Sequence, residues 1–290
     1  MLVKPFSRII CGTMSWGDWG KKFSIPQMQE LIEKAVDIGI NTFDHADIYG
    51  GYTTEKSFGE AFKKSSLPRE KLQFITKCGI QIPCEARPLE VKHYDYTASH
   101  IQLSVENTLK NLNTEYIDVL LLHRPSPLID ENIINDAIRK LQREGKVKEF
   151  GVSNFTPSQM DLIQQNIPLA WNQIECSLTH EVPMFDGTLD HMKINGVGTM
   201  AWSPLGIYFK ENSSQKKRIK KILLQLCEKY NSSEDQILLA WLLFHPSKIY
   251  PVVGTTSLKR LKRAFEAIKI KLEISDWFLL LEASMGKPIP

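Results

Sequence analysis

The stretch YIDVLLLHRPSPLIDENIINDAIRKLQREGKVKEFGVSN (116–154) decides the fold. It opens with the apolar run YIDVLLLH (116–123) and closes with a second strand-like run, VKEFGVSN (147–154). Between them, INDAIRKLQREGK (134–146) has apolar residues at helical spacing and ends at Gly145, a good helix stop. Near-continuous apolar runs are typical of parallel strands that are covered on both faces, so the stretch predicts strand, helix and strand of an α/β protein.

The same alternation extends along the chain. Eight strand-like runs occur, at 7–14, 40–46, 72–79, 116–123, 147–154, 169–176, 196–204 and 248–255. Helical patterns lie among them, at 24–39, 97–113, 134–146, 156–166, 217–230, 232–245 and 257–269, and a further helix is expected at 275–286. Since no linker rich in Pro, Gly or Ser divides the chain, we predict a single domain over residues 1–290. Its expected fold is a (β/α)8 TIM barrel with an additional C-terminal helix.

Composition excludes several classes of partner. The formal charge of +3 in 290 residues argues against nucleic acid and anionic membranes, and the basic run KKRIKK (216–221) fits a solvated helix face. No apolar run approaches the ~18 residues of a membrane helix, and no signal peptide opens the chain. The five cysteines are odd in number and scattered, which predicts a reduced, cytoplasmic protein. The sequence does not indicate an oligomeric state.

Four reactive side chains follow strand-like runs: Asp44, Tyr49, Lys77 and His123. Barrel enzymes carry their chemistry at the C-terminal ends of the strands, so an acid, a phenol, an amine and an imidazole are expected on one face. A phenol donates a proton poorly at neutral pH unless a neighbour lowers its pKa, and an ammonium group does so by favouring the phenolate. The set therefore predicts a general acid that protonates a carbonyl oxygen.

Seven motifs resemble those of the aldo-keto reductase family over nearly the whole chain. They are DHADIYG (44–50), ITKCG (75–79), LLHRP (121–125), GVSNFTPSQ (151–159), NQIECS (172–177), AWSPLG (201–206) and PVVGTTSLKRL (251–261). The chain is most similar to the bacterial single-domain oxidoreductases of that family. The resemblance implies a nicotinamide cofactor, usually NADPH, that gives a hydride to the carbonyl carbon of a small aldehyde or ketone while a tyrosine protonates the oxygen.

The resemblance also implies residue roles. Tyr49 matches the general acid, Lys77 and Asp44 the pair that tunes it, and His123 the residue that orients the carbonyl. The positions that match NADP(H)-binding residues are Ser153, Asn154 and Gln173 for the nicotinamide carboxamide, Trp202 for stacking on the nicotinamide, Ser203, Leu205 and Gly206 for the pyrophosphate, and Thr255, Thr256 and Arg260 for the adenosine 2′-phosphate. Trp16 is expected to line the substrate pocket, and Trp19, Tyr52 and the loop 80–96, a candidate lid, are further candidates.

Many members of the family carry a lysine at the position of Gly254, so we expect the preference for NADPH over NADH to be modest. No G-x-G-x-x-G follows a strand, which argues against a Rossmann dehydrogenase. Two other classes stay open. One is a cofactor-binding regulatory subunit with little turnover. The other is a metal-dependent barrel hydrolase using Asp44, His45, Asp47 and His123, although the chain lacks the paired histidines such sites commonly have.

Overall fold

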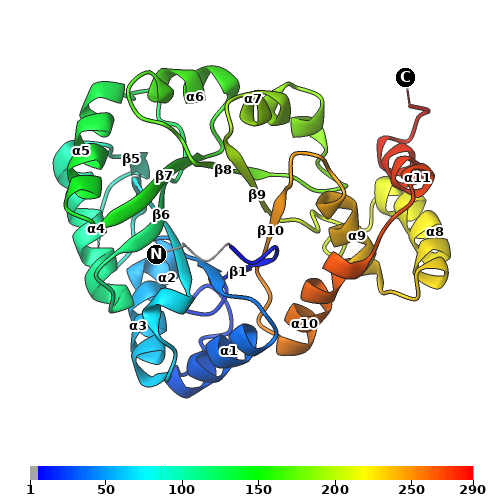
Figure 1. Ribbon diagram of the computed structural model, residues 1–290, viewed down its shortest axis with the longest axis horizontal. Coiled ribbons are helices and arrows are strands. Elements are labelled where there is room, and N and C mark those ends of the chain that lie inside the picture. Colours follow the sequence, from blue (N-terminus) through cyan, green and yellow to red (C-terminus); the bar gives the residue numbers. More distant parts are fainter. Residues whose placement is uncertain (1–5, 86, 290) are drawn as a thin grey trace.

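The computed structural model describes residues 6–85 and 87–289. Eight parallel strands close into a barrel in the order β1-β10-β9-β8-β7-β6-β3-β2 (Figure 1). They are β1 (Ile10–Gly12), β2 (Thr42–Asp44), β3 (Gln73–Cys78), β6 (Ile117–Leu122), β7 (Val147–Ser153), β8 (Trp171–Glu175), β9 (Gly198–Trp202) and β10 (Tyr250–Val253). Each strand falls within one of the eight expected runs, so the predicted (β/α)8 barrel is confirmed.

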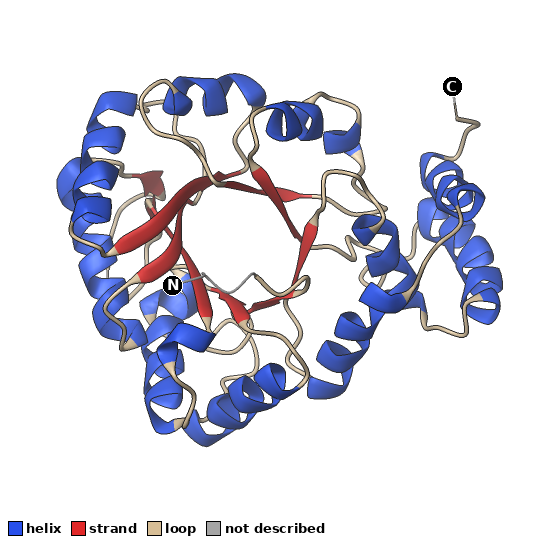
Figure 2. Ribbon diagram, in the orientation of Figure 1, coloured by secondary structure: helices blue, strands red, loops and turns tan. Residues whose placement is uncertain are grey.

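Helices form a ring around the barrel (Figure 2). Those that the sequence patterns predict are α1 (Ile25–Asp37), α4 (Ala98–Leu112), α5 (Glu131–Arg143), α6 (Pro157–Gln164), α8 (Ser214–Lys229), α9 (Glu234–Leu243), α10 (Leu258–Glu266) and the C-terminal α11 (Ile274–Met285). Three helices were not predicted: α2 (Tyr49–Tyr52), α3 (Thr54–Lys64) and α7 (Thr188–Ile194). Short 3-10 turns, η1 (Arg69–Lys71), η2 (Val182–Met184) and η3 (Ala267–Lys269), complete the connections.

Local chemistry explains why some helices could be predicted from the sequence and others could not. Helix α1 begins at a capping box formed by Ser24 and Gln27 and buries one apolar stripe. In α3 the apolar pattern is interrupted by Gly59, where a Cβ atom would lie 1.9 Å from the Asn111 carbonyl oxygen. The glycine lets α3 pack closely on α4, so a residue that weakens the helical pattern is required by the packing.

The barrel has an apolar interior and an apolar outer layer. Inside, Ile10, Ile75, Val119, Leu121, Met200 and Val252 form one buried cluster. The rings of Phe6 and Tyr250 both contact Trp171 edge to face at this cluster, with centroids 5.0 and 5.4 Å apart. Larger clusters fill the space between strands and helices. The interior below the C-terminal strand ends is therefore a packed core, and a ligand has room only above it.

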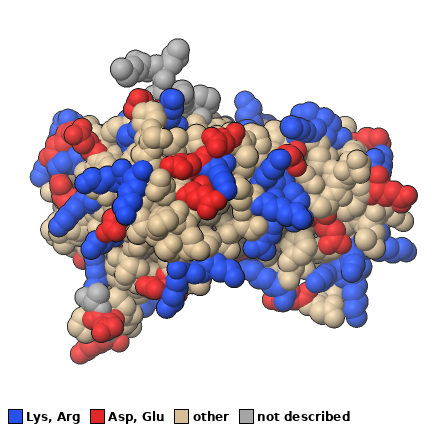
Figure 3. All heavy atoms as spheres, turned by 90° about the horizontal axis from the view of Figure 1, so that it is seen from below, with Lys and Arg blue, Asp and Glu red and all other residues tan. Residues whose placement is uncertain are grey.

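Two features lie outside the regular ring. Helices α8 and α11 lie beside one another beyond α9 (Figure 1). The segment 80–96 contains a small antiparallel pair, β4 (Ile80–Gln81) and β5 (His93–Tyr94). Acidic and basic side chains are interspersed over the face shown in Figure 3. Within residues 6–85 and 87–289, no helix is long and apolar enough to cross a bilayer.

Candidate active site

The four reactive side chains come from neighbouring parts of the barrel rim. Asp44 is the last residue of β2, and Lys77 is the last but one of β3. His123 directly follows β6. Because β2, β3 and β6 are adjacent and parallel, their C-terminal ends meet at the same edge. The sequence prediction that these residues share one face is reproduced in the structure.

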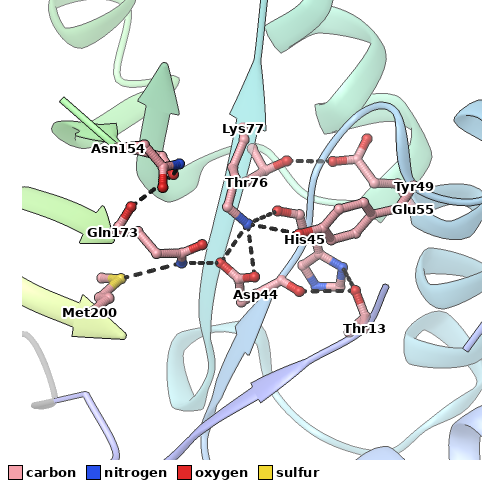
Figure 4. A network of polar contacts seen from close by, with 11 residues as sticks. Thr13, Asp44, His45, Tyr49, Glu55, Thr76, Lys77, Asn154, Gln173 and Met200 are labelled. Carbon is pink, nitrogen blue, oxygen red and sulfur yellow. Dashed lines mark hydrogen bonds and ion pairs between the residues drawn. The ribbon is translucent and has the colours of Figure 1, made fainter. Parts of the chain in front are cut away.

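Lys77 is the centre of a buried polar network (Figure 4). Its Nζ donates hydrogen bonds to Asp44 Oδ1 and Oδ2, at 2.8 and 2.7 Å, and to the His45 carbonyl oxygen at 2.8 Å. The Tyr49 hydroxyl lies 3.2 Å from the same nitrogen. Asp44 also accepts a bond of 2.7 Å from Gln173 Nε2. The Lys77 and Asp44 side chains are almost fully buried, so the pair is shielded from solvent and held by several bonds at once.

Tyr49 is placed by an unusual turn. It opens the single turn of α2, and the two residues after it, Gly50 and Gly51, have φ of 63° and 67°. A Cβ atom on Gly50 would lie 2.5 Å from Thr54 Oγ1, so both the left-handed conformation and the contact require glycine there. The turn directs the Tyr49 ring to Lys77 and leaves the residue about 9% exposed.

The protonation states follow from burial and charge. Burial lowers the pKa of the Lys77 ammonium, but Asp44 and Tyr49 outweigh this and hold the pKa above its ordinary value. Burial raises the pKa of the Tyr49 phenol. Lys77 lowers this pKa, and the Asp44 carboxylate raises it further. The net pKa of Tyr49 is raised, contrary to the expectation from Lys77 alone, because desolvation of the phenolate is the larger effect.

His123 is neutral at physiological pH. Burial lowers its pKa well below the ordinary value, and the charges of Lys77, Arg124 and Lys92 add to the effect. Its ring centroid lies 6.1 Å from that of Tyr49. A neutral imidazole beside a phenol can donate a hydrogen bond to a carbonyl oxygen without carrying a charge of its own.

A cavity of about 920 Å³ extends from these residues along the C-terminal face. Twelve of the predicted site residues line it: Asp44, Tyr49, His123, Ser153, Asn154, Gln173, Trp202, Ser203, Leu205, Gly206, Thr255 and Arg260. Lys77 does not line it, but its Nζ contacts Asp44 and Tyr49, which do. Thr256 does not line it, so a direct role for that hydroxyl has no support in this geometry.

One wall of the cavity is a chain of polar contacts. Ser153 Oγ donates to the Gln173 carbonyl oxygen, and Asn154 Nδ2 donates to Ser153 Oγ, both at 2.8 Å. Trp202 Nε1 donates to Asn154 Oδ1 at 2.8 Å, which fixes the indole ring at the cavity surface. Asn154 and Ser203 have left-handed backbones, with φ of 63° and 48°. Such conformations are uncommon outside glycine and gather at functional sites.

The far end of the cavity carries cations that sequence reasoning missed. Arg263 and Lys210 line it together with Arg260. The Arg263 guanidinium donates to Asp235 Oδ2 through Nε at 3.1 Å and Nη2 at 2.8 Å. Arg263 follows Arg260 by three residues on α10, and this spacing, which places the two on one helix face, was the available signal. A Cβ atom on Gly254 would meet no described atom within 4 Å, so the cavity is open at this position.

The prediction that Trp16 lines the substrate pocket is wrong. Trp16 is fully buried and packs against Phe23, Phe43 and Phe58 in the layer outside the barrel. Trp19 takes the expected place: it lines the cavity, is 46% exposed, and its ring lies 6.1 Å from that of Tyr49. Both residues lie in the loop after β1, where no regular period indicates which side chain turns inward.

Segment 80–96 borders the catalytic end of the cavity. Ile80, Ile82 and Lys92 contribute to the lining. Tyr52 does not line it but anchors the segment: its hydroxyl accepts a bond from the Ile82 backbone N–H at 3.1 Å, and the Arg87 guanidinium lies over its ring at 3.7 Å. The segment is thus tied to the turn that carries Tyr49.

The residues considered for a metal site do not converge. Both Asp44 oxygens are bonded to Lys77, His45 Nδ1 is 2.9 Å from Thr13 Oγ1, and Asp47 accepts a bond from Ser104. Within the described part of the chain, no group of three or more His, Cys, Asp and Glu side chains is arranged to hold a metal ion. The donor set therefore favours acid–base chemistry over metal-assisted hydrolysis.

Comparison with known proteins gives consistent matches over the whole chain. The oxidoreductase YdhF of Escherichia coli (strain K12) is 39% identical over 288 residues, covering 98% of this chain and 96% of that protein. The 6-dehydroglucose reductase of Agrobacterium fabrum (strain C58) is 38% identical over 286 residues, with the same coverage. Among solved structures, the thermostable aldo-keto reductase Tm1743, in complex with the inhibitor epalrestat, superposes with a TM-score of 0.81 at 28% identity, covering 98% of this chain and all of that one.

The family model for the aldo/keto reductase family matches residues 8–283. This range includes every strand of the barrel and all four reactive side chains described above. The chain therefore belongs to the aldo/keto reductase family.

Proposed function

We propose that this protein reduces aldehydes or ketones to alcohols with NADP(H), and that Tyr49 is the proton donor. The observation that carries the proposal is the contact of the Tyr49 hydroxyl with Lys77 Nζ, 3.2 Å apart, at the end of the cavity where His123 also lies. A buried phenol that accepts a hydrogen bond from an ammonium group is suited to giving up a proton during reaction, because the ammonium stabilises the phenolate that remains.

Each residue has a separate part in the reaction. Tyr49 gives its proton to the carbonyl oxygen as the carbonyl carbon is reduced. Asp44 keeps Lys77 charged, and Lys77 stabilises the developing phenolate. His123 donates a hydrogen bond that orients the carbonyl oxygen. When bound, the reduced nicotinamide supplies the hydride, so proton and hydride together convert the carbonyl to an alcohol.

The cavity residues fit a phosphorylated dinucleotide. At one end the Trp202 ring offers a flat apolar surface beside the amides of Asn154 and Gln173. At the other end, Arg260 and Arg263 supply guanidinium groups of the kind that bind phosphate through paired hydrogen bonds. Gly206, in the loop after β9, also lines the cavity. It has a φ of 53°, and a Cβ atom there would be 1.9 Å from Thr179 Oγ1, so the loop can take this close path only with glycine.

The proposal is tested by following NADPH and NADH oxidation with a panel of aldehydes and ketones. The panel includes a polyhydroxylated aldehyde, because a relative 38% identical carries the name 6-dehydroglucose reductase. We expect turnover of at least one aldehyde class, faster with NADPH than with NADH at subsaturating cofactor. Tight NADPH binding with no turnover of any carbonyl would contradict the proposal and indicate a binding role.

A further inference from the structure

In the lining of the cavity, cationic side chains outnumber carboxylates. The lining contains two carboxylates and five cations. Each carboxylate already has a partner, because Asp44 is bonded to Lys77 and Asp235 to Arg263. Arg260 is assigned to the cofactor, and Lys210 follows the segment Ser203–Gly206 that is assigned to its pyrophosphate. Lys92 and Arg124 remain, and neither forms an ion pair with any residue that the structure describes.

Arg124 is held beside the reacting groups. It directly follows His123, and its backbone is fixed by Tyr96, whose hydroxyl donates to the Arg124 carbonyl oxygen at 2.5 Å and accepts from its N–H at 3.2 Å. The guanidinium carbon lies 5.4 Å from the centre of the Trp202 ring. Its positive charge is one of the contributions that lower the pKa of the His123 imidazole, and it also opposes the raised pKa of the Tyr49 phenol. The backbone of this half-buried arginine is thus fixed next to His123, and its guanidinium lies over the Trp202 ring in the cavity that Tyr49 also lines.

Lys92 reaches the same end from segment 80–96. The segment is held in place by the bond from the Asp95 N–H to the Gly79 carbonyl oxygen, at 2.9 Å, and by the pairing of β4 with β5. Lys92 is itself exposed, but it lines the cavity and its charge contributes to the lowered pKa of His123. Two cations from different elements therefore face the space where a substrate would sit.

We propose that the carbonyl substrate carries an anionic group, such as a carboxylate or phosphate, and that Arg124, assisted by Lys92, binds it. This inference rests on the proposed function. A neutral polyhydroxylated group is recognised by hydrogen-bond acceptors as well as donors, and both carboxylates of the cavity are already engaged with cations. A guanidinium matches the two oxygens of a carboxylate, and the surrounding low-dielectric wall strengthens that interaction.

The test compares matched aldehydes that differ only in charge. Glyoxylate, succinic semialdehyde and 4-carboxybenzaldehyde, each paired with its methyl ester, place the anion at three distances from the carbonyl. For each pair, kcat/KM of the acid is divided by that of the ester, in the wild type and in Arg124→Gln. Differences in intrinsic reactivity cancel when the two ratios are compared. Arg143→Gln, an exposed position on α5 outside the cavity, is the control.

We expect Arg124→Gln to lower the ratio by about 10-fold to 150-fold for the acid that best spans the site, the effect of one charge-assisted hydrogen bond. Ester turnover falls together with acid turnover as far as the charge of Arg124 acts on Tyr49 and His123, and the ratio removes this common effect. The Kd of NADP⁺ should change by less than about threefold, and the control should leave all values unchanged. Lys92→Gln should lower the ratio less, and by an amount that falls with added salt, because the side chain is exposed.

Three results would overturn the inference. A ratio that is the same in wild type and Arg124→Gln for all three pairs would show that no anion is bound there. Equal losses for acids and esters with a weaker Kd for NADP⁺ would make Arg124 a cofactor residue. No turnover of any aldehyde by the wild type would remove the proposed function and this inference with it, whereas ester turnover with an unchanged ratio removes this inference alone.

Discussion

At the scale of single residues, burial and Lys77 shift the pKa of the Tyr49 phenol in opposite directions. Burial raises the pKa of the phenol, and the ammonium 3.2 Å away lowers it. The balance leaves the hydroxyl protonated before reaction, as a general acid must be, while the nearby charge stabilises the phenolate formed afterwards. The function of Lys77 is therefore to limit the effect of burial rather than to ionise the tyrosine at rest.

Removing Lys77 tests this role. Lys77→Met takes away the charge that opposes burial, so the pKa of Tyr49 rises further and proton donation weakens. We expect a loss of reductive turnover of about 10²–10⁴-fold, the usual range for general acid catalysis. Asp44→Asn should cost less, since it weakens the support of Lys77 without removing the ammonium. The measurement is the pH–rate profile of each variant; an unchanged profile in Lys77→Met would be incompatible with the role.

The adenosine end gives a second residue-scale prediction. Arg260→Ala should weaken NADP⁺ binding by about 10-fold, the lower end for a charge-assisted hydrogen bond, and leave NAD⁺ nearly unchanged. Arg263→Ala should act in the same direction, because Arg263 lines the same part of the cavity. Lys262→Ala, an exposed neighbour outside the lining, is the control. Fluorescence titration with both cofactors checks the prediction; equal losses for NADP⁺ and NAD⁺ would mean that the arginines act structurally.

At the scale of elements, the strands fix the catalytic groups and the helices outside them fix the strands. Helix α9 is buried nearly all round, between the barrel and the pair α8–α11. Trp241 of α9 and Trp277 of α11 stack with ring centroids 4.8 Å apart. Each indole N–H donates to the other residue's carbonyl oxygen, at 3.0 and 2.9 Å. This reciprocal contact attaches the C-terminal helix to the barrel.

Trp277→Ala should therefore destabilise the protein without changing its chemistry. Truncating a large buried aromatic side chain typically costs about 3–5 kcal/mol, and here the hydrogen bond from the Trp277 indole to the Trp241 carbonyl oxygen is lost in addition. Leu279→Ala, on the exposed side of the same helix, should cost less than about 1 kcal/mol. Urea unfolding measures the free energy of unfolding of both variants. Since no residue of α11 lines the cavity, a large fall in kcat of the folded Trp277→Ala variant would show that α11 has a part in catalysis.

At the scale of the whole molecule, a buried carboxyl couples stability to pH. Burial raises the pKa of Glu55 from 4.5 to about 7, although Thr76 and Thr108 bond to the carboxylate and lower it. The folded protein therefore binds this proton more tightly than the unfolded chain. The stabilisation is complete below about pH 4.5 and is lost as pH rises to about 7, where ionised Glu55 disfavours folding.

Glu55→Gln removes this dependence while keeping an oxygen that can accept from Thr76. The free energy of unfolding of the variant, relative to wild type, should rise by about 3 kcal/mol between pH 5 and pH 8, from about 1.4 kcal/mol for each unit of pKa difference. Glu60→Gln, on the exposed side of α3, should show no such rise. Urea unfolding at the two pH values decides; a difference that does not vary with pH would contradict the assignment.

The barrel was predictable because its strands are long apolar runs and because chain order alone brings their C-terminal ends to one face. Asp44, Lys77 and His123 were found for that reason. Helix α3 was not predicted, since Gly59 breaks its apolar stripe to allow close packing on α4. Both Trp16 and Trp19 were candidates for the pocket and Trp16 was preferred, although only Trp19 lines the cavity, because an irregular loop has no period that tells an inward side chain from an outward one.

The proton donor is the central claim, and Tyr49→Phe tests it most directly. The variant keeps the ring that packs beside Trp19 and His123 and removes only the hydroxyl. Steady-state NADPH oxidation with the best aldehyde, together with the Kd of NADP⁺, gives both quantities needed. We predict a loss of about 10²–10⁴-fold in kcat with cofactor binding nearly unchanged, because the acid acts in the transition state. Turnover retained within about a factor of two would contradict the assignment of Tyr49 as the proton donor.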